Sequence, residues 1–125
     1  MTPFVLPLSH PDAGLANVGG KGMSLAKLRA AGLPVPDGFH VTTAAYRQFV
    51  AHNGIQPRIV QTLGRIDPAD TAALETASQQ IRELFGRGET PPEISAAVAA
   101  AYTALHGAPV AVRSSATAED LPGAS

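Results

Sequence analysis

Two short stretches of this sequence combine residue types that suit the binding of an anion. The first is Val18-Gly19-Gly20-Lys21-Gly22, at the expected start of a helix. Backbone N–H groups at a helix start lack intrahelical acceptors, and the helix dipole favours negative charge there. Glycines let a ligand approach the backbone, and Lys21 adds a mobile positive charge. The stretch therefore suits a phosphate, but it matches neither G-x-x-x-x-G-K-[ST] nor G-x-G-x-x-G. The alternative is a plain glycine-rich loop with a solvated Lys21.

The second stretch follows an expected strand near the end of the sequence and reads RSSATAED, from Arg113 to Asp120. Arginine presents a planar set of donors that matches phosphate oxygens. The hydroxyls of Ser114, Ser115 and Thr117 add further donors. The acids Glu119 and Asp120 either hold Arg113 or approach a Mg²⁺ shell. The alternative is a structural ion pair between Arg113 and these acids, with the hydroxyls bonded within a turn.

No other residues form a recognisable catalytic or metal-binding pattern. The histidines lack H-x-x-x-H or H-E-x-x-H spacing, so each is expected to be solvated or hydrogen-bonded; they are His10, His40, His52 and His106. No serine lies in the context of a nucleophile elbow. The sequence therefore assigns no catalytic residue and no metal ligand.

The composition favours a small protein of the cytoplasm. Nine basic and ten acidic residues give a net charge of −1, which does not favour nucleic acid or an anionic membrane as a partner. There is no cysteine, which excludes disulfides and thiolate chemistry. The N-terminus lacks the basic and apolar regions of a signal peptide, and no apolar run is long enough to span a membrane. We therefore expect a soluble, cytoplasmic chain.

The elements that would position the two stretches alternate between strands and helices. Strands are expected at 4–6, 39–42 and 109–112, the last as an open edge. Helices are expected at 21–31, from the Thr43 cap to an end at Asn53-Gly54, at 57–63, from 68 or 71 to 85, and from about 91 to 105. Thr43 is expected to cap its helix, Thr90 to form a capping box with proline first in the helix, and Gly32 to end the first helix. The fold class is therefore α/β (α+β) and helix-rich.

Three separate stretches together resemble one known family. They are VGGKGMSLAKL, GLPVPDGFHVTTAAYRQF and VAVRSSATAEDLPGAS, in this order. They resemble the N-terminal nucleotide-binding domain of the phosphoenolpyruvate-utilising dikinases, which include phosphoenolpyruvate synthase, pyruvate phosphate dikinase and rifampicin phosphotransferase. Three motifs in the same order are far more specific than any one of them.

The resemblance implies an ATP-grasp-like fold in which Lys21 and Arg113 contact the phosphates of ATP. Gly19, Gly20, Ser114, Ser115 and Thr117 are candidates for further contacts. In this family the β-phosphate of ATP passes to a histidine on a separate swivelling domain, and AMP and phosphate leave. The phosphoryl group then passes to pyruvate or, in the resistance enzymes, to rifampicin.

The resemblance also implies that residues 1–125 are the first part of this ATP-binding domain. The rest of the ATP-grasp domain, the Mg²⁺ ligands and the phosphohistidine domain are expected elsewhere, so we expect no activity from these residues alone. Three possibilities stay open: a fragment of a longer enzyme, a separate module that binds a nucleotide or a partner protein, and an inactive remnant. The acceptor, pyruvate or rifampicin, is not specified by the sequence.

Overall fold

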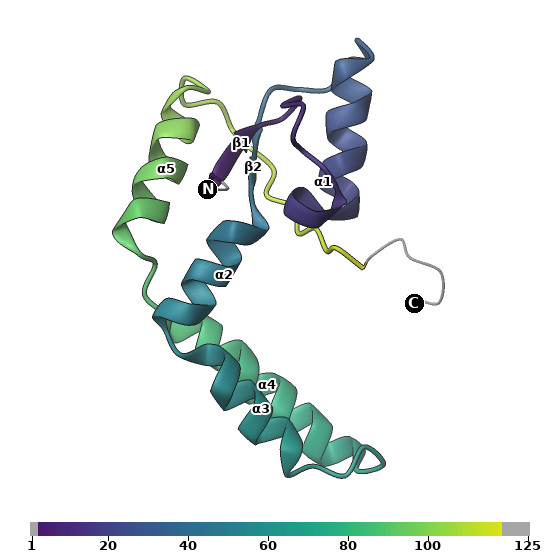
Figure 1. Cartoon of the computed structure of the whole chain (residues 1–125), viewed down its shortest axis with the longest axis vertical. Helices are drawn as coiled ribbons and strands as arrows, with labels where there is room; N and C mark the ends of the chain where they lie inside the picture. The colour runs from purple at the N-terminus through teal and green to yellow at the C-terminus, as the bar shows by residue number, and fades with distance from the viewer. Residues whose placement is uncertain (1–2, 119–125) are drawn as a thin grey trace. The chain divides into compact units, whose positions relative to one another are not determined.

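The computed structural model describes residues 3–118, and these fall into two compact units (Figure 1). The first unit combines the residues up to Tyr46 with those from Pro92 onward, and the second is Arg47–Pro91. Most elements are helices, and this confirms the helix-rich α/β class expected from the sequence. Within residues 3–118, no helix is both long and apolar enough to cross a bilayer.

The first unit contains a two-stranded antiparallel sheet of β1 (Val5–Pro7) and β2 (Phe39–Val41). Leu6 lies opposite His40 in this ladder, and both residues are buried. Residues directly opposite in a ladder share one face of the sheet, so this pair points into the core. Both strands lie within one residue of the ranges expected from the sequence.

Two helices flank this sheet in Figure 1. α1 (Leu15–Ala30) contacts β2, and α5 (Pro92–Thr103) contacts β1. The buried apolar side chains of this unit are Leu6, Leu8, Val18, Ala26, Ala45 and Ile94. α5 begins at Pro92, one residue later than expected, so a proline does stand first in this helix.

α1 is interrupted at Gly19, whose φ of 73° and ψ of 179° are not helical. Regular helix resumes at Gly20, close to the start expected from the sequence. The sequence does not predict the turn before it, because its Gly, Asn, Asp and Pro residues favour loops. Asn17 stabilises this turn, since its Oδ1 accepts the N–H of Gly14 at 2.7 Å. After the helix, Gly32 has a φ of +83°, as expected for a left-handed C-terminal residue.

The prediction that Thr43 caps the next helix is wrong. α2 (Thr43–His52) already includes Thr43, and the Thr43 hydroxyl donates to the carbonyl of Ala16 at 2.9 Å. The carbonyl of Thr42 instead accepts the N–H of Ala45 at 3.1 Å. A side chain that bonds outside its own helix is not available to satisfy the first N–H groups of that helix.

The predicted strand Pro109–Val112 is also wrong for the part of the chain that the structure describes. Residues 108–116 are extended but lie in no strand ladder, and β1–β2 is the one sheet within residues 3–118. A strand is defined by pairing with a neighbour, and the local sequence does not supply that neighbour. Val112 is 94% exposed, so its apolar side chain packs against nothing substantial here.

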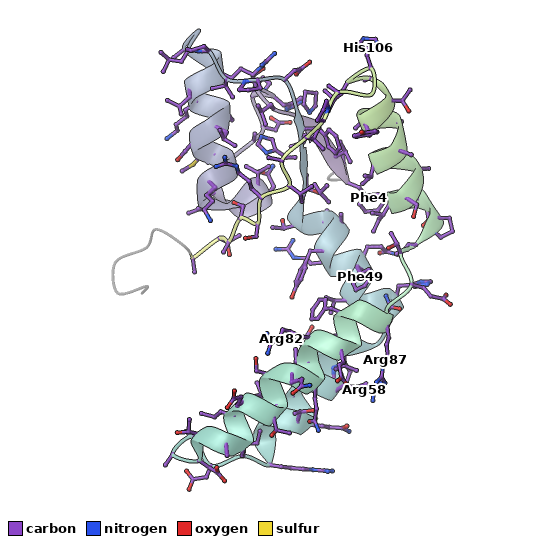
Figure 2. All side chains as sticks on the ribbon, turned by 180° about the vertical axis from the view of Figure 1, so that it is seen from behind. Phe4, Phe49, Arg58, Arg82, Arg87 and His106 are labelled. Carbon is purple, nitrogen blue, oxygen red and sulfur yellow. The ribbon has the colours of Figure 1, made fainter. Side chains whose placement is uncertain are left out.

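The second unit is built from the rest of α2 with α3 (Ile55–Gly64) and α4 (Thr71–Arg87). α3 and α4 lie side by side, with Ile55 and Ala77 buried (Figure 1). The rings of Phe49 and Phe85 stack at 6.0 Å with an angle of 11° between their planes. Figure 2 labels Phe49 at the end of this unit where α2 lies. Helical apolar spacing predicts core positions, and this is confirmed for Ala77 but wrong for Leu74, which is 39% exposed. It is also wrong for Tyr46 and Tyr102, which are 57% and 41% exposed.

Side-chain hydrogen bonds hold the ends of the second unit. Asp70 caps α4, because its Oδ1 accepts the N–H of Ala73 at 3.1 Å. Asn53, just after α2, donates from Nδ2 to the carbonyl of Glu89 at 2.9 Å and accepts the Glu89 N–H at 2.8 Å. Positions 36 residues apart are thus fixed to each other by one side chain.

Candidate functional site

The two stretches that the sequence predicts to bind an anion meet in the first unit, although they are far apart in the sequence. The N–H of Gly20 donates to the carbonyl of Ala116 at 3.0 Å, and the N–H of Gly22 donates to Ser115 Oγ at 3.2 Å. The second bond links positions 93 residues apart. In Figures 1 and 2 the C-terminal segment runs down to the start of α1. We call this pair of hydrogen bonds the motif junction.

Gly19 makes room for the motif junction. A Cβ at this position would overlap Ser115 Oγ and would lie 2.9 Å from the N atom of Ala116. Its backbone also has a positive φ combined with an extended ψ, a region that essentially only glycine occupies. Glycine is therefore required here twice, once for the backbone conformation and once for the approach of the second stretch.

Gly22 makes room for a buried histidine. A Cβ at Gly22 would lie 2.9 Å from the Cβ of Val18 and 3.2 Å from Nδ1 of His40. His40 is 8% exposed, and its Nε2 lies 2.9 Å from the carbonyl oxygen of Leu8. A carbonyl only accepts, so this geometry places the proton on Nε2. The expectation of a hydrogen-bonded histidine is thus confirmed for His40, whose ring lies close to Gly22 of α1.

The two basic residues of the candidate site, Lys21 and Arg113, are both exposed. The motif junction connects the main-chain segments that carry them. Lys21 stands between Gly20 and Gly22, the two donors of the junction. Arg113 precedes the acceptor Ser115 by two residues, and two residues span at most about 7 Å. The main chain thus brings the Lys21 and Arg113 positions into one region of the surface.

The remaining candidates divide into two groups. The Gly20 N–H and the Ser115 hydroxyl already have protein partners in the motif junction, and Gly19 lies against Ser115. Ser114 and Thr117 are exposed, and within residues 3–118 their hydroxyls form no hydrogen bond. Glu119 and Asp120, the expected partners of Arg113, lie outside the described residues. Arg113 forms no ion pair with any other residue in the described part of the chain.

The sequence does not predict that the carbonyl of Ala116 accepts the Gly20 N–H, or that His40 lies close to Gly22 of α1. An alanine contributes to the junction only through its carbonyl, which every residue possesses, so its type carries no signal. For His40, the signal is its position in an alternating strand, where residues of one face are buried. For a metal, residues 3–118 offer no group of three or more His, Asp or Glu side chains arranged to hold an ion.

The sequence of the chain is similar to that of a known family of nucleotide-binding domains. Residues 15–125 match the model of the pyruvate phosphate dikinase AMP/ATP-binding domain. The chain is 41% identical over 128 residues to a probable phosphoenolpyruvate synthase of Methanothermobacter thermautotrophicus, with 98% of the chain and 18% of the relative covered. It is 46% identical over 124 residues to a probable phosphoenolpyruvate synthase of Methanocaldococcus jannaschii, with 94% of the chain and 10% of the relative covered.

A relative named for a different activity is equally similar. The chain is 46% identical over 126 residues to a rifampicin phosphotransferase of a Streptomyces species, with 98% of the chain and 14% of the relative covered. The chain thus spans between 10% and 18% of the length of these three relatives. Because the match covers residues 15–125, and so both stretches of the motif junction, the chain belongs to the family of the pyruvate phosphate dikinase AMP/ATP-binding domain.

Proposed function

We propose that Lys21 and Arg113 bind the phosphate groups of ATP together, within a phosphotransferase of the dikinase type. The observation that carries this proposal is the motif junction, which connects the two segments that bear these side chains. A polyphosphate carries several negative charges, so one ligand engages an ammonium and a guanidinium at once. Ser114 and Thr117 are proposed as further donors, because their hydroxyls are exposed beside Arg113.

Gly19 and Gly20 are proposed to support this site through the backbone, and Ser115 through its hydroxyl. Mg²⁺ is proposed to accompany ATP, since metal ions neutralise developing charge in phosphoryl transfer. We place its protein ligands outside this chain, together with the histidine that receives the β-phosphate.

The phosphoryl acceptor is proposed to be pyruvate, the acceptor implied by relatives named as phosphoenolpyruvate synthases. Rifampicin is the second candidate, because a relative named rifampicin phosphotransferase is as similar as either of them. A binding module without catalysis is the third. Incubation of the full-length protein with Mg-ATP and either acceptor separates them. AMP beyond one equivalent per enzyme should form only with the true acceptor, and no AMP should form with either acceptor if the protein only binds.

The phosphate site is tested by calorimetric titration of full-length Lys21→Ala and Arg113→Ala with Mg-ATP and with adenosine. Loss of a charge-assisted hydrogen bond costs about 1.5–3 kcal/mol, so each variant should bind ATP about 10- to 150-fold more weakly. Adenosine lacks phosphates, so its affinity should not change. A control is Arg47→Ala, which removes an exposed arginine of the second unit.

If Arg113 instead serves as an ion-pair partner of Glu119 or Asp120, Arg113→Ala should lower the thermal stability and leave the ATP affinity of the folded protein unchanged. Equal ATP affinities in the wild type and both variants, with folding intact, would contradict the proposed site.

A further inference from the structure

The glycine-rich stretch uses its N–H groups for the protein itself. Gly20 and Gly22 are buried, and their N–H groups donate to Ala116 and Ser115 rather than pointing into an open cradle. The absence of a Cβ at Gly19 serves the same contact, because any side chain there would displace Ser115. The structure therefore gives this stretch a second segment of chain as its immediate neighbour.

We propose that Ser115 is a positioning residue, which sets the place of Arg113 relative to Lys21 without touching the nucleotide. This inference rests on the proposed function. Ser115 Oγ accepts the Gly22 N–H, and the next residue accepts the Gly20 N–H. Two adjacent bonds fix both the position and the direction of the segment, so the residue two places earlier is presented to one side of α1.

The chemistry of the Ser115 hydroxyl agrees with this role. As an acceptor from a backbone N–H, the oxygen is held at the helix start, where Gly19 leaves space for it. Ser114 differs, since within residues 3–118 its hydroxyl makes no bond and is available for other contacts. Neighbouring serines thus have different tasks: Ser115 holds the segment, and Ser114 faces solvent.

A double-mutant cycle in the full-length protein tests the inference, with Mg-ATP titrated into Ser115→Ala, Arg113→Ala and the double variant. A neutral hydrogen bond contributes about 0.5–1.5 kcal/mol, which predicts a loss of about 2- to 12-fold in ATP affinity for Ser115→Ala. In the Arg113→Ala background the same change should cost nothing further, because there is no guanidinium left to position. Adenosine affinity should stay unchanged, and Ser115→Thr, which keeps the hydroxyl, should restore ATP binding.

Ser24→Ala is the matched control, because Ser24 is an exposed serine of α1 that forms no side-chain hydrogen bond within residues 3–118. It should leave ATP affinity unchanged. A second readout is independent of ATP. Hydrogen exchange of peptides covering residues 19–23 should be faster in Ser115→Ala than in the wild type or in Ser24→Ala.

Each other outcome overturns the inference. An equal loss of affinity for Ser115→Ala with and without Arg113 means that Ser115 contacts the nucleotide itself. Unchanged exchange at residues 19–23, or unchanged ATP affinity in Ser115→Ala while Arg113→Ala weakens binding, removes the positioning role and leaves the proposed function standing. A wild-type protein that does not bind ATP overturns the proposed function, and the positioning role with it.

Discussion

At the scale of single residues, the glycines near Lys21 are explained by what lies against them. Gly19 combines a positive φ with a close approach to Ser115, and Gly22 lies against His40. The sequence indicates that small residues are needed in this stretch and predicts that a phosphate approaches them. The protein neighbour that the structure shows there comes from a segment 93 positions away, and no local pattern encodes such a distance. From the sequence, only the family resemblance predicts that the two stretches lie close together.

Gly19→Ala should destabilise the first unit. A non-glycine residue in this region of φ and ψ costs about 1–3 kcal/mol, and the new Cβ would also displace Ser115. We expect the free energy of unfolding from urea denaturation to fall by at least about 1 kcal/mol, and ATP affinity to fall as well.

The control is Gly86→Ala in α4, where a Cβ meets no atom within 4 Å. Alanine is preferred to glycine in a helix by about 0.5–1 kcal/mol, so this variant should be at least as stable as the wild type. A Gly19→Ala protein as stable as the wild type would show that the described geometry at Gly19 is not required.

At the scale of helices and strands, the sequence predicts those elements whose signals are local. The helices of the second unit follow apolar periodicity and end at glycines or polar residues close to the expected positions. The sequence-based predictions fail where the conformation of a segment depends on a contact with another part of the chain. Residues 109–112 have the composition of a strand but no ladder within the described residues. The first turn of α1 is stabilised by the Asn17 side chain. The sequence does not predict this turn, because its residue types are those that favour loops.

The Asn53 side chain links the end of α2 to the segment that follows α4, and its substitution tests how much this link stabilises the second unit. Asn53→Ala removes the bonds to both the carbonyl and the N–H of Glu89, and also the bond from Nδ2 to the carbonyl of Phe49 at 2.9 Å. Each of the three bonds contributes about 0.5–1.5 kcal/mol, so we expect the free energy of unfolding, measured by urea denaturation, to fall by about 1.5–4.5 kcal/mol.

Asn53→Asp is the matched comparison, because it keeps the acceptor for the Glu89 N–H and loses the Nδ2 donor. Its stability should lie between those of Asn53→Ala and the wild type. Limited proteolysis within 88–91 should follow the same order, and equal cleavage of all three proteins would contradict the closing role of Asn53.

At the scale of the whole molecule, the segment at 109–112 leaves apolar side chains uncovered. Val110 is 47% exposed and Val112 is 94% exposed, while the main chain of this segment has no ladder partner among the described residues. Extended, unpaired and apolar chain is a known site of association between molecules.

We therefore expect the 125-residue chain to bind a hydrophobic dye and to associate as its concentration rises. Val112→Lys should weaken both effects, because a charged side chain on an open edge opposes pairing. Val60→Lys is the matched control, since Val60 is 63% exposed but lies in α3 of the second unit. Sedimentation that shows a monomer at all concentrations, or an equal effect of both substitutions, would contradict this expectation.

The bond between Gly22 and Ser115 can form only late in synthesis, because its two partners are far apart in the chain. Synthesis proceeds at about 5–20 residues per second, so the 93 residues between these partners take about 5 to 20 s to emerge. During that time Lys21 exists without Arg113, and the whole second unit is synthesised and free to fold before the bond can form. The phosphate site proposed above therefore forms only after the second unit has been synthesised.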